Sequence, residues 1–214
     1  MFGRPGAVRL LGYRNHVDTG SFNDAIAAFQ ADPGKNSFGC TAAGLYNYND
    51  PADGHPGNPT APDLCWVRQP NVKLGAGISV EQYVAQDIGL FLRAMYSDGH
   101  TEVDAYNPAD RSFSLGAVAK GTLWHRPFDV TGAGFGMSWI SAAHAAYLAM
   151  GGVDGFVGDG RLQQAGEGIV EAFYSFNLVK ALWLSADYQH LWNPGFNADR
   201  GPVDIYGVRI HVEF

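Results

Sequence analysis

An alternation of apolar and polar residues with a period of two is the strongest pattern in this sequence. In residues 204–214, the even positions from Tyr206 to Phe214 are apolar, whereas the odd positions include Arg209 and His211. Successive side chains of a strand point to opposite faces, so this strand has one apolar face and one charged face. Its length of about eleven residues matches a tilted strand that crosses the hydrocarbon core of a bilayer.

Seven further segments show the same alternation. They are approximately residues 6–15, 72–84, 88–97, 112–120, 129–140, 161–176 and 181–192. The connections between successive segments are long and short in turn. Bacterial outer-membrane barrels have this arrangement, with long loops outside and short turns in the periplasm. We therefore predict an all-β fold, an antiparallel transmembrane β-barrel, and about eight of its strands within the single domain 1–214.

The composition agrees with a transmembrane barrel. Charged residues make up 16% of the chain, against roughly 25% in soluble domains. The chain also has 28 glycines, 13% aromatic residues and a mean hydropathy of -0.12, and no segment qualifies as a membrane-spanning helix. A net charge of -7 argues against nucleic-acid binding. Residues 1–5 contain no apolar signal sequence, so for an exported barrel we expect the true amino-terminus to lie further upstream.

Residues 18–71 form the longest polar interval and are expected to be an extracellular loop. A short helix should begin after Ser21 and end before Pro33, and a second short helix is expected at residues 142–150 in another long loop. Cys40 and Cys65 lie in the first loop and are candidates for a disulfide, which would contribute about 3.5 kcal/mol in the chain-entropy model. A zinc site would need two more ligands, so we predict no metal.

Several short motifs are distinctive. They are GLFLR at residues 89–93, SFSLG at 112–116, WHRP at 124–127, DYQ at 187–189 and the run at 193–214. In these stretches, and at residues 6–10, the sequence resembles the carbohydrate-selective porins of bacterial outer membranes, the OprB-like family. The long interval before Asn71 departs from the family's pattern.

The resemblance implies a bacterial outer-membrane porin through which small neutral sugars diffuse passively, with no catalysis and no cofactor. Members are expected to have sixteen strands, so the chain would be the carboxy-terminal half, without the first half and the signal peptide. Its partners would be outer-membrane lipid, the barrel-assembly machinery acting on the last strand, and two further copies in a homotrimer. Phe214 would be the assembly signal.

A sugar in such a lumen needs polar partners for its hydroxyls and a flat surface to slide over. Residues on the polar face of the strands could supply both. The candidates are Lys73, Glu81, Phe91, Arg93, Lys120, Glu167, Glu171, Trp183, Asp187, Gln189 and Arg209. Arginine has a rigid fork of donors, so Arg93 and Arg209 are the strongest candidates for a constriction. Alternatively, these groups only hydrate the lumen and pair with one another.

Two other functions remain open at this stage. A small closed barrel of eight strands would have a filled interior and could act as an outer-membrane anchor or adhesin. A soluble β-sandwich could be a lectin or an enzyme. A glycosidase pair of Glu167 and Glu171 is disfavoured, because residues four apart on one strand lie about 13 Å apart. Inverting glycosidases need no more than about 9.5 Å.

Overall fold

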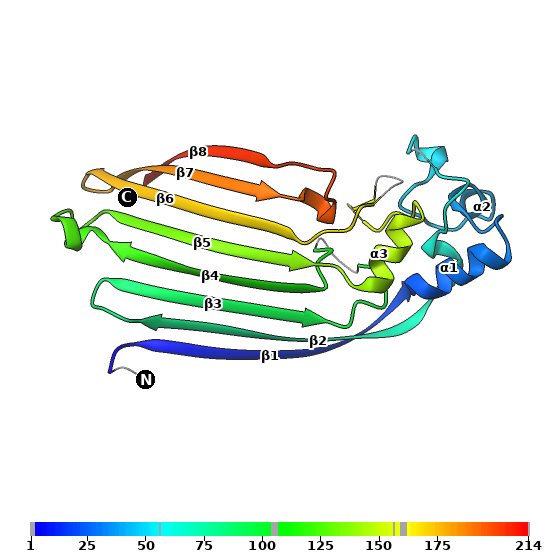
Figure 1. Cartoon of the computed structure of the whole chain (residues 1–214), viewed down its shortest axis with the longest axis horizontal. Helices are drawn as coiled ribbons and strands as arrows, with labels where there is room; N and C mark the ends of the chain where they lie inside the picture. The colour runs from blue at the N-terminus through cyan, green and yellow to red at the C-terminus, as the bar shows by residue number, and fades with distance from the viewer. Residues whose placement is uncertain (1–2, 56, 104–106, 156, 159–161, 214) are drawn as a thin grey trace.

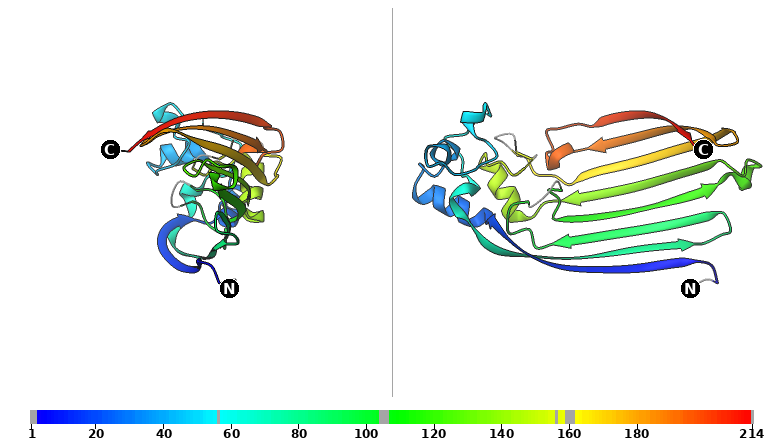
Figure 2. Two further views of the ribbon diagram at one scale, coloured as in Figure 1. Left: turned by 90° about the vertical axis from the view of Figure 1, so that its left-hand side faces the viewer. Right: turned by 180° about the vertical axis from the view of Figure 1, so that it is seen from behind.

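The computed structural model of the chain describes residues 3–55, 57–103, 107–155, 157–158 and 162–213. Eight antiparallel strands form one sheet in sequence order (Figure 1). They are β1 (Gly6–Gly20), β2 (Arg68–Tyr83), β3 (Ile88–Ser97), β4 (Arg111–Lys120), β5 (Val130–Trp139), β6 (Glu167–Val179), β7 (Leu182–Trp192) and β8 (Val203–Val212). The sheet curves into an open arc with β1 and β8 at its edges (Figure 2). The predicted antiparallel all-β fold is confirmed.

The connections lie at two different ends of the sheet. The short turns and η3 (Gly121–Trp124) lie at one end, which we call the turn end. The long connections lie at the other, the loop end, with the remaining helices α1 (Phe22–Ala31), α2 (Ser37–Ala42), α3 (Ala142–Ala149), η1 (Pro51–Asp53), η2 (Leu64–Val67) and η4 (Pro194–Phe196). In the part of the chain that the structure describes, none of these helices has the length and apolar character to cross a membrane.

Two predicted boundaries need correction. The first hairpin continues beyond its apolar part, with Asp18 paired to Pro70 and Gly20 to Arg68, so the loop spans residues 21–67 rather than 18–71. Strand pairing joins backbone groups and does not require alternating side chains, so the sequence pattern ends before the ladder does. Conversely, β6 begins later than predicted, at Glu167 rather than near residue 161. Within the first loop, α1 begins at the predicted cap, where Ser21 accepts from Asp24 N–H, whereas α2 was not expected.

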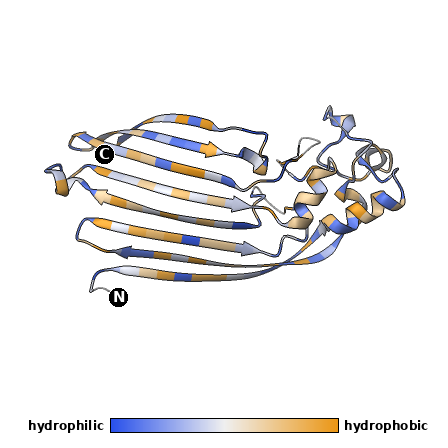
Figure 3. Cartoon of the chain, in the orientation of Figure 1, coloured by the Kyte–Doolittle hydropathy of each residue, from blue (hydrophilic) through white to orange (hydrophobic). Residues whose placement is uncertain are grey.

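The two faces of the sheet differ as the alternation predicts. On one face, large apolar side chains are open to the surroundings: Leu10 is 79% exposed, Tyr206 78% and Val208 80%. We call this the apolar face, and the opposite one the polar face. Figure 3 shows apolar and polar residues in turn along the strands. The apolar stripes do not pack against a second sheet, since the described strands form a single layer. A sandwich, which would bury them, is therefore excluded.

The turn after η3 is fixed by a buried carboxylate. Asp129 is only 1% exposed and accepts hydrogen bonds from Arg126, from Tyr174 Oη at 2.6 Å and from Asn177 N–H at 2.9 Å. The hydrogen bond from Arg126 lowers the pKa of Asp129 to about 2. Trp124 Nε1 donates to Tyr174 Oη at 2.9 Å. This network ties the turn between β4 and β5 to β6.

The hydrophobic core lies in the loops rather than in the sheet. Its fully buried side chains come from three long connections and include Phe22, Leu64, Leu148 and Phe196. Helix α1 packs against α3, so the connections β1–β2 and β5–β6 meet over the loop end (Figure 1). Burial of this apolar surface gives the loops a fixed structure that their Gly- and Pro-rich sequence alone would not have.

The two cysteines form a disulfide that closes the first loop. Cys40 in α2 is joined to Cys65 in η2; the two Cα atoms are 6.3 Å apart, and the residues are 25 positions apart in the sequence. Both side chains are buried. Asp63 Oδ1 accepts a hydrogen bond from Cys65 N–H at 2.9 Å and so caps the N-terminus of η2.

We expect a Cys40→Ser/Cys65→Ser variant to keep its barrel but to lose stability in the first loop. The chain-entropy model gives about 3.5 kcal/mol for a loop of this length. Limited proteolysis within residues 33–62 should therefore be much faster than in the wild type, and a reducing agent should speed cleavage of the wild type only. Equal cleavage rates for both proteins without reductant would contradict a stabilising role.

Candidate functional site

The polar face brings most of the predicted lumen residues into register. Glu81 on β2 is paired with Phe91 on β3, and Glu171 on β6 with Gln189 on β7. Gly116 and Gly134 on β4 and β5 complete the row between them. The candidates gather in two recesses of this face, one on β1–β3 and one on β6–β8.

The first recess has a volume of about 530 Å³ and is lined by Glu81 and Arg93, which form a small ion-pair network with the neighbouring Arg9. Glu81 Oε1 lies 3.1 Å from Arg9 Nη1 and 3.9 Å from Arg93 Nη2. The guanidinium of Arg93 lies 5.5 Å from the centre of the Phe91 ring. The three charged side chains are 44–63% exposed, and such pairs contribute little to stability. Their donors and acceptors therefore remain available to a solute.

Glycines beneath the aromatic rings keep this face flat. The Phe91 ring lies so close to Gly116 that a Cβ there would be 2.5 Å from it, and Phe173 lies equally close to Gly132. Both rings therefore rest on the backbone of the neighbouring strand. Phe173 was not among the predicted residues, although its position two residues after Glu171 places it on the same face.

The second recess has a volume of about 710 Å³. It contains five of the predicted residues, namely Glu171, Trp183, Asp187, Gln189 and Arg209. Asp187 Oδ1 accepts from Gln189 Nε2 at 3.1 Å. Two serines that had not been predicted, Ser175 and Ser185, also line it, and their hydroxyls are 2.9 Å apart.

The other predicted lumen residues have different surroundings. Lys73 Nζ donates to the carbonyl oxygens of Thr101 at 3.1 Å and Glu102 at 3.3 Å, so it holds the β3–β4 loop. Glu167 accepts from Gly195 N–H at 2.7 Å and holds the β7–β8 loop. Lys120 lies at the turn end of β4 and lines neither recess. Phe214 lies outside the described residues.

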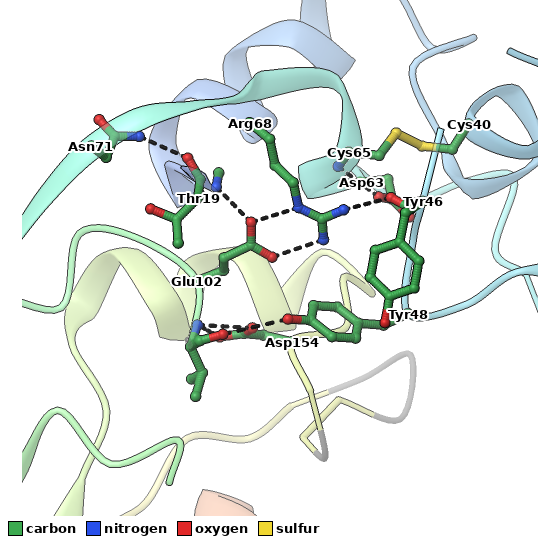
Figure 4. A network of polar contacts seen from close by, with 12 residues as sticks. Thr19, Cys40, Tyr46, Tyr48, Asp63, Cys65, Arg68, Asn71, Glu102 and Asp154 are labelled. Atoms are coloured by element: carbon green, nitrogen blue, oxygen red, sulfur yellow. Dashed lines mark hydrogen bonds and ion pairs between the residues drawn. A yellow bond between two sulfur atoms is a disulfide. The ribbon is translucent and has the colours of Figure 1, made fainter. Parts of the chain in front are cut away.

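A buried ion pair fastens the first loop to the β3–β4 loop (Figure 4). Arg68 Nε and Nη2 donate to the two carboxylate oxygens of Glu102 at 2.7 and 2.8 Å. The Glu102 side chain is 3% exposed and that of Arg68 20%. Glu102 also accepts from Gly20 N–H at 2.6 Å, while Arg68 Nη1 donates to the carbonyl oxygen of Tyr46. Arg68 and Glu102 are 34 positions apart in the sequence, which explains why no local sequence signal revealed the pair.

A second buried group joins the β3–β4 and β5–β6 loops. Both carboxylate oxygens of Asp154 accept from Val103 N–H at 3.1 Å. His144 is fully buried and stacked on Phe22, with Nε2 3.3 Å from Asp154 Oδ2 and Nδ1 3.4 Å from Asp110 Oδ2. Burial raises the pKa of Asp154 to about 6, although the nearby His144 acts in the opposite direction.

We expect Glu102→Gln to release the loops locally. The variant leaves the buried guanidinium of Arg68 without its carboxylate, which costs about 3 kcal/mol for a buried pair. Hydrogen exchange of the amides in residues 21–67 should become faster by the corresponding factor. The control is Glu81→Gln, which alters an exposed pair and should leave exchange unchanged; equal protection in both variants would refute the role of the buried pair.

Loop stability should also fall as the pH rises through the titration of Asp154. Its folded-state pKa of about 6 lies above the ordinary value, so the protonated form is favoured in the folded loop. The contribution of protonated Asp154 to the stability of the folded loops is complete below about pH 4 and is lost as the pH passes 6. The free energy of unfolding of the loops should fall by an amount on the order of 3 kcal/mol over this range. Proteolysis of the loops from pH 4 to 8 should show this loss in the wild type. In the Asp154→Asn variant, which retains His144, the rate of proteolysis should depend less on pH. The same pH profile in the variant and the wild type would contradict the assignment of this titration to Asp154.

The chain was compared with known proteins. The model of the carbohydrate-selective porins, OprB family, matches residues 2–214. Among curated proteins, no sequence matches the chain significantly. The fold is similar to the high-pH structure of OprB from Pseudomonas putida, with a TM-score of 0.68 and 18% sequence identity. That alignment covers 100% of this chain and 46% of the other, so the chain spans about half of its length.

The structural likeness concerns the fold, since the identity is low, but the family match extends over nearly the whole chain. OprB-family porins are outer-membrane proteins of Gram-negative bacteria and form transport channels rather than enzymes. The eight-stranded antiparallel sheet agrees with the fold of that family. The chain therefore belongs to the OprB family of carbohydrate-selective porins.

Proposed function

We propose that the chain forms about half of the wall of a water-filled channel in the outer membrane, through which small neutral sugars diffuse passively. The apolar face contacts lipid, and the polar face lines the lumen. The loop end faces the outside of the cell and the turn end faces the periplasm, as in other bacterial barrels.

The observation that carries this proposal is the contrast between the two faces of one sheet layer. Leu10, Val208 and Tyr206 are left exposed on one side, and the Arg9–Glu81–Arg93 network is left exposed on the other. A single layer with an uncovered apolar face is stable only where that face meets hydrocarbon. The charged face then needs water, which a pore supplies.

A closed eight-stranded barrel receives no support from the strand pairing. β1 and β8 are the two edges of the described sheet and do not pair with each other. A closed barrel would need that pairing to satisfy its backbone. The glycosidase interpretation gains nothing either, because Glu167 accepts a backbone hydrogen bond from Gly195.

The full channel, on this proposal, has about sixteen strands, the others coming from a part of the protein that is not in this chain. The assembly machinery would act on β8 and the residues after it, and three copies would associate through their apolar faces. The first recess is the constriction. There Arg93 offers donors to sugar hydroxyls, with Arg9 close by on the other side of Glu81, and Phe91 offers a flat ring.

We expect Arg93→Ala in the full-length porin to weaken sugar binding without abolishing the channel. A lost hydrogen bond to a charged group corresponds to about 1.5 kcal/mol, or roughly tenfold in Kd. Single-channel recording in planar bilayers with increasing glucose gives this Kd from the block of ion current. Leu92→Ala, on the apolar face of the same strand, is the matched control and should behave as the wild type. A full-length wild type that forms no channels, or channels indifferent to sugars, would overturn the proposed function.

A further inference from the structure

The second recess contains an aromatic ring that is held in a fixed position. Trp183, near the start of β7, reaches across the neighbouring strand, and its Nε1 donates to the carbonyl oxygen of Phe128 at 3.1 Å. The centre of its ring lies 5.8 Å from that of His211 on β8. A hydrogen bond at one edge and a ring contact limit the rotamers of the indole, so it offers a preformed flat surface.

Polar groups line the same recess as this ring and offer donors and acceptors. Asp187 presents carboxylate oxygens and Arg209 a guanidinium, while Ser175 and Ser185 present hydroxyls. All of them line the same recess of about 710 Å³, which is within the range of roughly 300–1,000 Å³ for small-molecule sites. Hydroxyl groups of a sugar can both donate and accept, so this mixed set suits them better than a set of one charge.

The second recess is a separate hollow on the same face of the sheet. It is lined mainly by β6–β8, whereas the first recess is lined mainly by β1–β3. Within the second recess, Trp183 is paired with Asn177, close to the turn between β6 and β7. Trp183 therefore lies at the turn end of the polar face.

We propose that Trp183, Ser185 and Arg209 form a second binding site for a pyranose sugar at the periplasmic end of the lumen. The inference rests on the proposed function, since it concerns the same path. Ser185 lies two residues from Trp183 on β7 and is paired with Arg209 on β8. The face of the pyranose that carries C–H groups lies on the indole, and its hydroxyls bond to the Ser185 hydroxyl and the Arg209 guanidinium. A second weak site lets a sugar leave the constriction without one large step, because conduction requires sites that release as well as bind.

The test is current block by glucose in the full-length porin, with the sugar added separately on the loop side and on the turn side. Trp183→Leu removes the flat ring, and Trp183→Phe keeps one. We expect the leucine variant to raise the Kd for sugar added on the turn side about fivefold, and the phenylalanine variant to stay within about twofold of the wild type. Leu184→Ala, on the apolar face of the same strand, is the matched control and should not change the Kd.

Ser185→Ala provides an independent variant, should the leucine protein fail to assemble, and is expected to raise the same Kd about threefold. If the wild type is blocked by glucose but neither Trp183→Leu nor Ser185→Ala alters the turn-side Kd, the second site is refuted and the proposed function stands. If Trp183→Phe binds as weakly as Trp183→Leu, the role of the flat ring is refuted. A wild type without any sugar-dependent block would overturn the proposed function itself.

Discussion

In the hydrocarbon of a membrane, every backbone N–H and C=O has to find its partner within the protein. The sheet meets this requirement along the seams between successive strands, and the long β1–β2 ladder is the most extended of them. The outer edges of β1 and β8 carry rows of groups that need further strands. An arc of strands in lipid has to be completed into a ring of strands. The curvature of the sheet, the register of its strands and its placement in the membrane all follow from that requirement.

The loops lie in water rather than in hydrocarbon. They therefore bury Phe22, Leu64 and Leu148 in a small hydrophobic core, as soluble proteins do. A disulfide and the Arg68–Glu102 ion pair stabilise this loop region. The sheet thus exposes its apolar side chains, whereas the loop region that is joined to it buries its apolar side chains. Lys73 and Glu167 connect the two parts, since each leaves the strand wall to hold a loop.

The sequence was sufficient for the strands and their faces because side-chain direction in a strand depends only on parity. Parity therefore predicted a common face for Glu81, Phe91 and Glu171, but their position in one row depends on the register of the strands, which parity does not fix. It could not show which polar residues hold loops, since Lys73 and Arg93 have the same local pattern. The ion pair of Arg68 with Glu102 and the position of His144 between two carboxylates depend on how distant loops meet. Neither of these two arrangements produces a periodic pattern in the sequence.

The glycines under Phe91 and Phe173 have a consequence for how this wall can evolve. A side chain at Gly116 or Gly132 would displace the ring above it toward the middle of the passage. The shape of the polar face thus depends on Gly116 and Gly132 as well as on the side chains that project from it. Exchanging either glycine for alanine would shift an aromatic ring by steric contact, although the alanine itself would lie beneath that ring.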